Sequence, residues 1–273
     1  MMAGSGALND PWIVESYAEL VAKAALDGYV KIGKDINITD EYPEGDMPTL
    51  SMGDCDIDGN GKTIMNWYKN TSGYCIANTD NTDTLCNIHN LFLKNICIDG
   101  DTTAFCYRAE DNGSRPFFEN CNFSGVMHKS FTFGQDGTLR FKGCSFNIDL
   151  GDKRPFDGVA GSFDNCFVRF KSDHQYAFFF DYGVNKVAKD SYFEMTLPNI
   201  TVLDNYGSGF DNCILDITSD NSFNVGGGNH AVSILHGGHA PHANADGTNV
   251  KKVNADEWLN VSVLHDTYGF NAG

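Results

Sequence analysis

The segment CDIDGNGKTI, residues 55–64, is the stretch on which the fold assignment turns. Three carboxylates and a glycine around its start have the D-x-D-x-D-G spacing of an EF-hand calcium loop: Asp54, Asp56, Asp58 and Gly59. An EF-hand also needs a bidentate Glu at the twelfth loop position, which is Met65 here. The apolar residues around the segment look like strand residues rather than parts of two helices. We therefore do not expect an EF-hand, and the segment needs another explanation.

Composition points to an all-β protein with many turns. The chain has 273 residues, 41% of them hydrophobic, with 29 Gly and 20 Phe against only 7 Pro. Gly and Asn recur between short aromatic or β-branched runs, as they do between the strands of β proteins. The length is enough for one large core.

The charge and the apolar runs exclude two classes of partner. The formal net charge is −17, which repels phosphate backbones, so we expect no nucleic-acid partner. No apolar run approaches the roughly 20 residues that span a bilayer, so we expect no membrane insertion.

The cysteines predict a reducing compartment. The chain start, MMAGSGALNDPW, lacks the basic residues and apolar stretch of a secretory signal, so we expect a product made and kept in the cytoplasm. The 9 cysteines are an odd number, and none has C-x-x-C spacing. Buried free thiols are therefore favoured over a disulfide framework or a zinc or redox motif.

A repeat of about 23 residues runs through the chain. Segments such as FFENCNF, RFKGCSF, SFDNCFV and GFDNCIL share an apolar residue, two turn-forming residues, Cys and then apolar residues. With a serine at one position, this column falls at intervals of 23, 22, 25 and 22 residues: Cys121, Cys144, Cys166, Ser191 and Cys213. A second column falls at intervals of 23, 24, 23 and 22: Gly134, Asp157, Asp181, Asp204 and Gly226.

This period indicates a solenoid of stacked coils. No part of the repeat has helical spacing, and regular Leu positions are absent, so helical and leucine-rich repeats are excluded. Each coil would hold two or three short strands and would stack on the preceding coil with a strand-to-strand separation of roughly 4.8 Å. The cysteines and phenylalanines would then stack inward, while Asn and Gly would take turn positions that need positive φ.

The opening segment now has an explanation. IDGNGKTI resembles the I-x-G-x-G-x-x-I signature that wraps an early corner of right-handed parallel β-helices of the pectate-lyase-like class. The resemblance implies an all-β fold, a single right-handed parallel β-helix of about nine or ten coils. It covers residues 29–273, and residues 1–28 would form an N-terminal leader and capping helix.

The two ends of the coil need caps, because an open end exposes core and unpaired strand edges. Residues 14–27 predict a helix with a capping box at Ser16 and Glu19, an apolar face, and a stop at Gly28. The preceding GSGALNDPWIV resembles a leader found before such helices in bacterial surface proteins and bacteriophage virion proteins. At the far end, EWLNVSVLHDTYGFNAG predicts a last strand pair and a tail.

An acidic column is the best catalytic candidate for an enzyme on this fold. On neighbouring coils, Asp157, Asp181 and Asp204 would lie about 5 Å apart per coil and about 10 Å across two, which brackets the separations used in glycoside hydrolysis. The competing interpretation is that each Asp begins a turn. We favour that one, because Gly replaces Asp at positions 134 and 226. Of the four polygalacturonase motifs on this fold, only N-T-D is matched, by NTDNTD at residues 78–83.

A histidine-rich loop is the candidate metal site. His236, His239 and His242 form an H-x-x-H-x-x-H run that could gather on one zinc or iron ion, and His230 precedes them. The loop is rich in Gly, Pro and Asn, so we favour an exposed contact loop and expect no metal or other cofactor.

Three observations, the absence of a secretory signal, the acidic charge and the unoxidised cysteines, agree with what the resemblance to virion proteins implies. We therefore expect a non-enzymatic structural component of a bacteriophage virion, in the tail, baseplate or capsid decoration. Expected partners are other virion proteins and two further copies of the chain in a trimer, and host surface glycans are a candidate ligand. The alternative is a polysaccharide-degrading hydrolase or lyase. A bacterial surface adhesin is a weaker option, because it would need an export signal.

Overall fold

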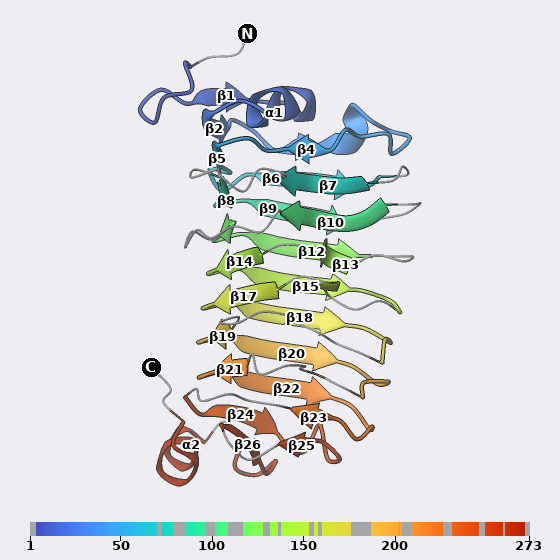
Figure 1. Cartoon of the computed structure of the whole chain (residues 1–273), viewed down its shortest axis with the longest axis vertical. Coiled ribbons are helices and arrows are strands. Elements are labelled where there is room, and N and C mark those ends of the chain that lie inside the picture. The colour runs from blue at the N-terminus through green and yellow to red at the C-terminus, as the bar shows by residue number, and fades with distance from the viewer. Residues whose placement is uncertain are drawn as a thin grey trace.

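The structure is a computed structural model, and it shows a parallel β-helix (Figure 1). It describes residues 4–69, 73–78, 86–96, 102–108, 117–127, 132–135, 138–152, 156–157, 160–175, 187–201, 203, 209–225, 231–245, 249–258 and 260–270. Within these residues, every pairing between the named strands is parallel, and the strands stack along the long axis of the molecule. The predicted all-β solenoid is confirmed.

Sheet 1 runs along one side of the stack. It contains nine strands among the described residues: β1 (Trp12–Val14), β2 (Gly28–Ile32), β5 (Cys55–Asp58), β8 (Asn87–His89), β11 (Phe118–Glu119), β14 (Thr138–Lys142), β17 (Ala160–Asp164), β19 (Val187–Lys189) and β21 (Gly209–Asp211).

Sheet 2 has ten described strands, which fits the expected nine or ten coils. They are β3 (Ile36–Asn37), β6 (Thr63–Trp67), β9 (Phe92–Ile96), β12 (Asn122–Val126), β15 (Ser145–Asp149), β18 (Phe167–Lys171), β20 (Tyr192–Thr196), β22 (Ile214–Thr218), β24 (Ser233–His236) and β26 (Val250–Val253).

Sheet 3 has five described strands: β4 (Leu50–Ser51), β7 (Gly73–Asn78), β10 (Thr102–Arg108), β13 (Thr132–Gln135) and β16 (Phe156–Asp157). Near the C-terminal end, β23 (Asn224–Val225) pairs with β25 (Asn244–Ala245). A short 3-10 helix, η1 (Ile38–Asp40), follows β3.

The cysteine column is confirmed as a stacked, inward-facing row. The backbone N–H that follows each column residue donates to the carbonyl of the column residue one coil earlier, as from Ser145 to Cys121 and from Phe167 to Cys144. All eight described cysteines are buried and free. The thiols also bond between coils, for example Cys144 Sγ to the Phe118 carbonyl at 3.5 Å.

The residue before each column position has the left-handed backbone conformation that was predicted for the turns. Its φ lies between 48° and 60° in five successive coils: Asn120, Gly143, Asn165, Asp190 and Asn212. Asn, Asp and Gly are the residue types that tolerate this conformation at least cost. The same turn between sheets 1 and 2 therefore recurs in these coils because each has a residue type that tolerates positive φ.

Strand alternation places phenylalanines inside the coil. In β18, the burial pattern of FVRFK alternates, with Val168 and Phe170 inside. Inside the stack, Phe141 lies between Phe118 and Phe163, with ring centroids 5.6 Å and 5.2 Å away. The core is thus a ladder of aromatic rings from successive coils.

The N-terminal cap is a helix, as predicted, but it is shorter than the expected residues 14–27. Val14 belongs to β1, and Gly28 begins β2 instead of ending the helix. Helix α1 (Tyr17–Ala24) begins at Ser16, whose hydroxyl accepts from the Glu19 N–H at 3.2 Å. Its apolar face is buried at Tyr17, Leu20 and Ala24 and lies over the first coils (Figure 1).

The predicted last strand pair is wrong. Residues 261–268 form helix α2 (Val261–Tyr268) instead. Asn260 caps its N-terminus through Val263 N–H, and Gly269, at φ 75°, ends it. The apolar residues that suggested a strand, among them Leu264, pack with Ile234 and Val253 in a small cluster separate from the main core. Residues 254–258 and 260–270, which we call the C-terminal segment, therefore cover the outer face of sheet 2 at its last strands.

Candidate functional site

The acidic column falls mostly outside the described residues. Asp181 and Asp204 lie outside them, and only the backbone of Asp157 is described. In sheet 3, Asp157 pairs with Gln135, and Phe156 pairs with Gly134. The expected alignment of Gly134 with Asp157 is therefore wrong by one residue. Because neighbouring residues of a strand face opposite sides, a one-residue offset changes the face.

The histidine loop does bring two of its predicted ligands together, with a third group that the sequence analysis missed. His236 at the end of β24 and His239 in the following turn lie next to Asp216 of β22, and we call these three residues the Asp–His–His cluster. His242 is exposed and is not part of the cluster, and His230 lies outside the described residues.

Local structure fixes each member of the cluster. In β22, Leu215 and Ile217 are in the core, so Asp216 faces outward. Leu215 pairs with Leu235 of β24, which places His236 one step further along on the same outer face as Asp216. The next turn is held by two backbone hydrogen bonds, from Gly237 N–H to the Val253 carbonyl at 2.8 Å and from Ser219 N–H to the His239 carbonyl at 3.0 Å.

The three side chains are in direct contact. The Nδ1 atom of His239 lies 2.6 Å from Oδ1 of Asp216, and Nδ1 of His236 lies 3.6 Å from the same oxygen. The two imidazole rings are 3.9 Å apart, centroid to centroid. The ring of Trp258, from the C-terminal segment, covers His236 at 4.2 Å.

The electrostatics of the cluster favour a neutral His236. Burial lowers the pKa of His236, the neighbouring His239 lowers it further, and the Asp216 carboxylate opposes the change. Burial also raises the pKa of Tyr192 to about 12, with Asp216 adding to it, and the Tyr192 hydroxyl reaches Asp216 Oδ2 at 3.4 Å.

Asp216 carried a signal that sequence reasoning could have used. It follows the cysteine column by three residues, at an outward position of its strand, where Arg169 and Glu194 precede it on earlier coils. Glu194 and Asp216 are two acids on adjacent strands, and like charges opposite each other are destabilising unless a cation or donor joins them. Glu194 pairs with Arg169 of the preceding coil, whereas Asp216 meets His239 of the following coil.

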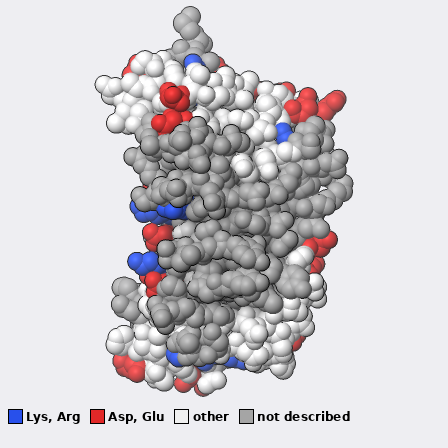
Figure 2. Space-filling model, in the orientation of Figure 1, with Lys and Arg blue, Asp and Glu red and all other residues white. Residues whose placement is uncertain are grey.

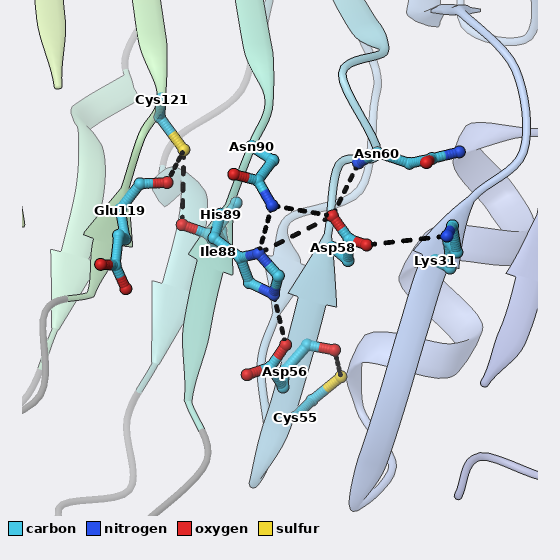
Figure 3. Close-up of polar contacts among 10 residues, drawn as sticks. All are labelled: Lys31, Cys55, Asp56, Asp58, Asn60, Ile88, His89, Asn90, Glu119 and Cys121. Carbon is cyan, nitrogen blue, oxygen red and sulfur yellow. Dashed lines mark hydrogen bonds and ion pairs between the residues drawn. The ribbon is translucent and has the colours of Figure 1, made fainter. Parts of the chain in front are cut away.

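The opening segment forms a turn between β5 and β6, with strands on both sides instead of the helices of an EF-hand. Figure 3 shows its acids among side chains of neighbouring coils. Asp56 Oδ1 is 2.7 Å from His89 Nε2, and Asp58 Oδ1 accepts from Asn90 at 3.2 Å. The hydrogen bond to Asp56 is the main cause that raises the pKa of His89, and it outweighs burial.

These acids belong to a larger pattern that the sequence analysis did not find, which we call the charge ladder. Eight residues in register on successive strands of sheet 1 alternate in sign, with His89 at a cationic position: Lys31, Asp58, His89, Glu119, Lys142, Asp164, Lys189 and Asp211. Figure 2 shows blue and red side chains alternating down the edge where β14 to β21 lie in Figure 1.

The contacts along the ladder join one coil to the next. Lys142 Nζ lies 2.9 Å from Glu119 Oε1, and Lys31 Nζ lies 3.9 Å from Asp58 Oδ2. A single exposed ion pair of this kind contributes little to the stability of the fold. The alternation of the charges instead fixes register, because a slip between coils would place like charges opposite each other.

Comparisons with known proteins give no relative to which this chain can be assigned. No family model matches the chain, and neither a curated protein nor a solved structure matches it. Among the described residues, no helix has the length and apolar character needed to cross a membrane.

Proposed function

We propose that the protein is a non-enzymatic structural component of a bacteriophage virion, in the tail, baseplate or capsid decoration. The observation that carries the proposal is the continuous stack itself. Among the described residues, sheet 2 alone contains ten strands in line, which corresponds to a rod of roughly 43 Å at 4.8 Å per strand. The resemblances of IDGNGKTI to pectate-lyase-like β-helices and of GSGALNDPWIV to virion leaders favour the same conclusion.

The chemistry of the stack suits a stiff part that assembles in a reducing cytoplasm. Register is held by the charge ladder and by hydrogen bonds between coils, and the eight described cysteines remain thiols. Burial raises the pKa of Cys55, Cys75 and Cys213 to about 12, so these thiols stay protonated and unreactive. Such a rod needs no oxidation step before it is built into a particle.

The proposed partners are other virion proteins and two further copies of this chain. We place the contact between copies on the outer face of sheet 2. Three of the large apolar side chains that stay exposed lie on this face: Phe92, Val126 and Phe167, with 41%, 41% and 39% exposure. The rings of Phe167 and Tyr192 also stack on this face, 5.3 Å apart. A trimer would bury one long flank of each rod there.

Light scattering at micromolar concentration tests the assembly. A mass of three chains is expected for the natural protein, and Phe167→Glu should shift it toward one chain. The matched control is Leu26→Glu, which makes the same kind of change at an exposed apolar residue outside sheet 2. A clean monomer for the unsubstituted protein would count against the trimer.

Composition analysis of purified particles tests the virion assignment. Mass spectrometry of phage particles from the strain that carries the gene should find this chain at a fixed copy number. Its absence from intact particles would refute the proposal.

The alternative, a polysaccharide-degrading hydrolase or lyase, depends on Asp157, Asp181 and Asp204. It is tested by incubating the protein with bacterial capsular and plant polysaccharides, and by measuring reducing ends and the absorbance of unsaturated products. We expect no turnover. Activity that Asp181→Asn abolishes would reverse the ranking of the two functions, and binding without turnover would identify a host glycan as a ligand.

A further inference from the structure

We propose that Asp216, His236 and His239 bind a divalent transition-metal ion, with Zn²⁺ as the best fit. The proposal is independent of the virion assignment, because it depends only on side chains at the last coils. The three residues each offer one ligand atom, and these atoms all lie within 4.8 Å of one another. Ligands of a tetrahedral zinc ion lie about 3.3 Å apart, so adjustments of about 1 Å would suffice.

One buried polar atom of the cluster has no hydrogen-bond partner. The side chain of His236 is 7% exposed, and its Nδ1 atom is buried without a hydrogen-bond partner. The nearest carboxylate oxygen, Asp216 Oδ1, is 3.6 Å away, too far for a hydrogen bond. Buried polar atoms are rarely left unpaired, and an ion bridging His236 to Asp216 would satisfy this one.

The backbone around the ligands leaves little room for rearrangement. A Cβ on Gly238 would lie 2.8 Å from the Cβ of Ala255, and a Cβ on Gly237 would lie 2.6 Å from the Val253 carbonyl oxygen. The turn between the two histidines is therefore held closely against β26 and the C-terminal segment. Trp258 covers His236 from the same segment. Because packing already holds the ligand residues in place, less conformational entropy is lost when an ion binds.

The ligand set selects the class of ion. Two imidazoles and one carboxylate suit Zn²⁺ and its transition-metal neighbours, whereas Ca²⁺ and Mg²⁺ prefer oxygen ligands. His239 is half exposed, so the cluster opens to solvent on its side. With three protein ligands, water would take the remaining tetrahedral position, and the ion would exchange with a chelator in solution.

The test is titration of the full-length, EDTA-treated protein with ZnCl₂ by calorimetry, with CoCl₂ as a spectroscopic probe. We expect one ion per chain, a raised thermal midpoint, and the intense visible bands of four-coordinate Co²⁺. Asp216→Asn and His239→Gln should each weaken binding by at least about tenfold. Both keep side-chain size, and circular dichroism checks that they fold.

Two histidines outside the cluster provide matched controls. His242→Gln changes an exposed histidine of the same loop. His265→Gln changes an exposed histidine that also lies 2.8 Å from a carboxylate, that of Asp266. Both controls should bind like the natural chain. The proposal is overturned if no ion binds at one per chain, if neither cluster variant weakens binding, if a control variant abolishes it, or if Ca²⁺ or Mg²⁺ binds there in preference to Zn²⁺.

Discussion

Replacing Phe141 by alanine tests the stacked core at its centre. The Phe141 side chain is 1% exposed. Its ring stacks on those of Phe118 and Phe163, and meets the rings of Phe123 and Phe146 edge-on at 6.1 Å and 5.0 Å. The substitution would therefore leave a cavity bounded by rings from three coils.

The expected cost follows from burial and ring contacts. A buried Phe→Ala change costs about 3–5 kcal/mol of unfolding free energy, and aromatic pairs add about 0.5–1.5 kcal/mol each beyond burial. Measured costs of buried Phe→Ala changes already contain such ring contacts, so with these four described aromatic neighbours we expect a loss near the upper end of that range, about 4–5 kcal/mol, for Phe141→Ala. The free energy of unfolding of a domain is only about 5–15 kcal/mol in total, so the variant should fold but be marginally stable.

The matched control is the same substitution on the outside of the coil. Phe167 is 39% exposed, and its ring stacks on Tyr192 of the next strand. Cross-strand pairs of this kind contribute about 0.2–1 kcal/mol, so Phe167→Ala should cost about 1 kcal/mol or less. The measurement is urea unfolding followed by circular dichroism and by fluorescence of the buried Trp67, with equal m-values required for the comparison. Equal losses for the two variants would refute the assignment of inner and outer faces.

Three further predictions concern the charge ladder and the thiols. The pKa of His89 is raised above its usual 6.5, so its stabilising contribution should be complete below that value and fall as pH rises through the folded-state pKa. The natural chain should therefore exceed His89→Gln in unfolding free energy by less at pH 8.5 than at pH 5.5. A difference that grows with pH would contradict the cationic role of His89 in the charge ladder. Lys142→Glu should destabilise the protein because it places three acids in a row, and the loss should be smaller in high salt. Adding Glu119→Lys to the same chain should restore part of the lost stability. If nothing is restored, the charge ladder does not couple these coils. Alkylation followed by peptide mapping should leave all eight described cysteines unmodified until the protein is unfolded, and rapid labelling of Cys144 in the native state would show that the column is not inside.

The fold could be predicted because its determinants are local and repeated. The cysteine column, with Ser191 as one member, was found from spacing alone, and the left-handed turn before it followed from the residue types that tolerate positive φ. The N-terminal helix was predictable because Ser16 and an apolar face define it without reference to distant residues. The C-terminal helix was not, because a residue such as Leu264 fits a strand as well as a helix when its packing partners, Ile234 of β24 and Val253 of β26, are unknown.

The residues of the Asp–His–His cluster also include some that local sequence could group and one that only strand pairing brings to the site. His236, His239 and His242 could be grouped from the sequence because they are close together in the chain. Asp216 is twenty residues upstream of His236, and only the pairing of β22 with β24 brings them to one face. The charge ladder was visible as the residue two before each cysteine-column position, yet its alternating sign has meaning only when those positions are known to be stacked.

The sequence by itself determined that this chain coils at intervals of about 23 residues, because turn conformation and strand alternation are properties of short segments. Only the tertiary structure decided which side chains meet between coils, because the register of one coil on the next depends on every insertion between them. A change of one residue reverses the face of a strand, and the structure pairs Gly134 with Phe156, where the spacing had aligned it with Asp157. Contacts such as that of Asp216 with His239 therefore follow from stacking and could not be read from spacing.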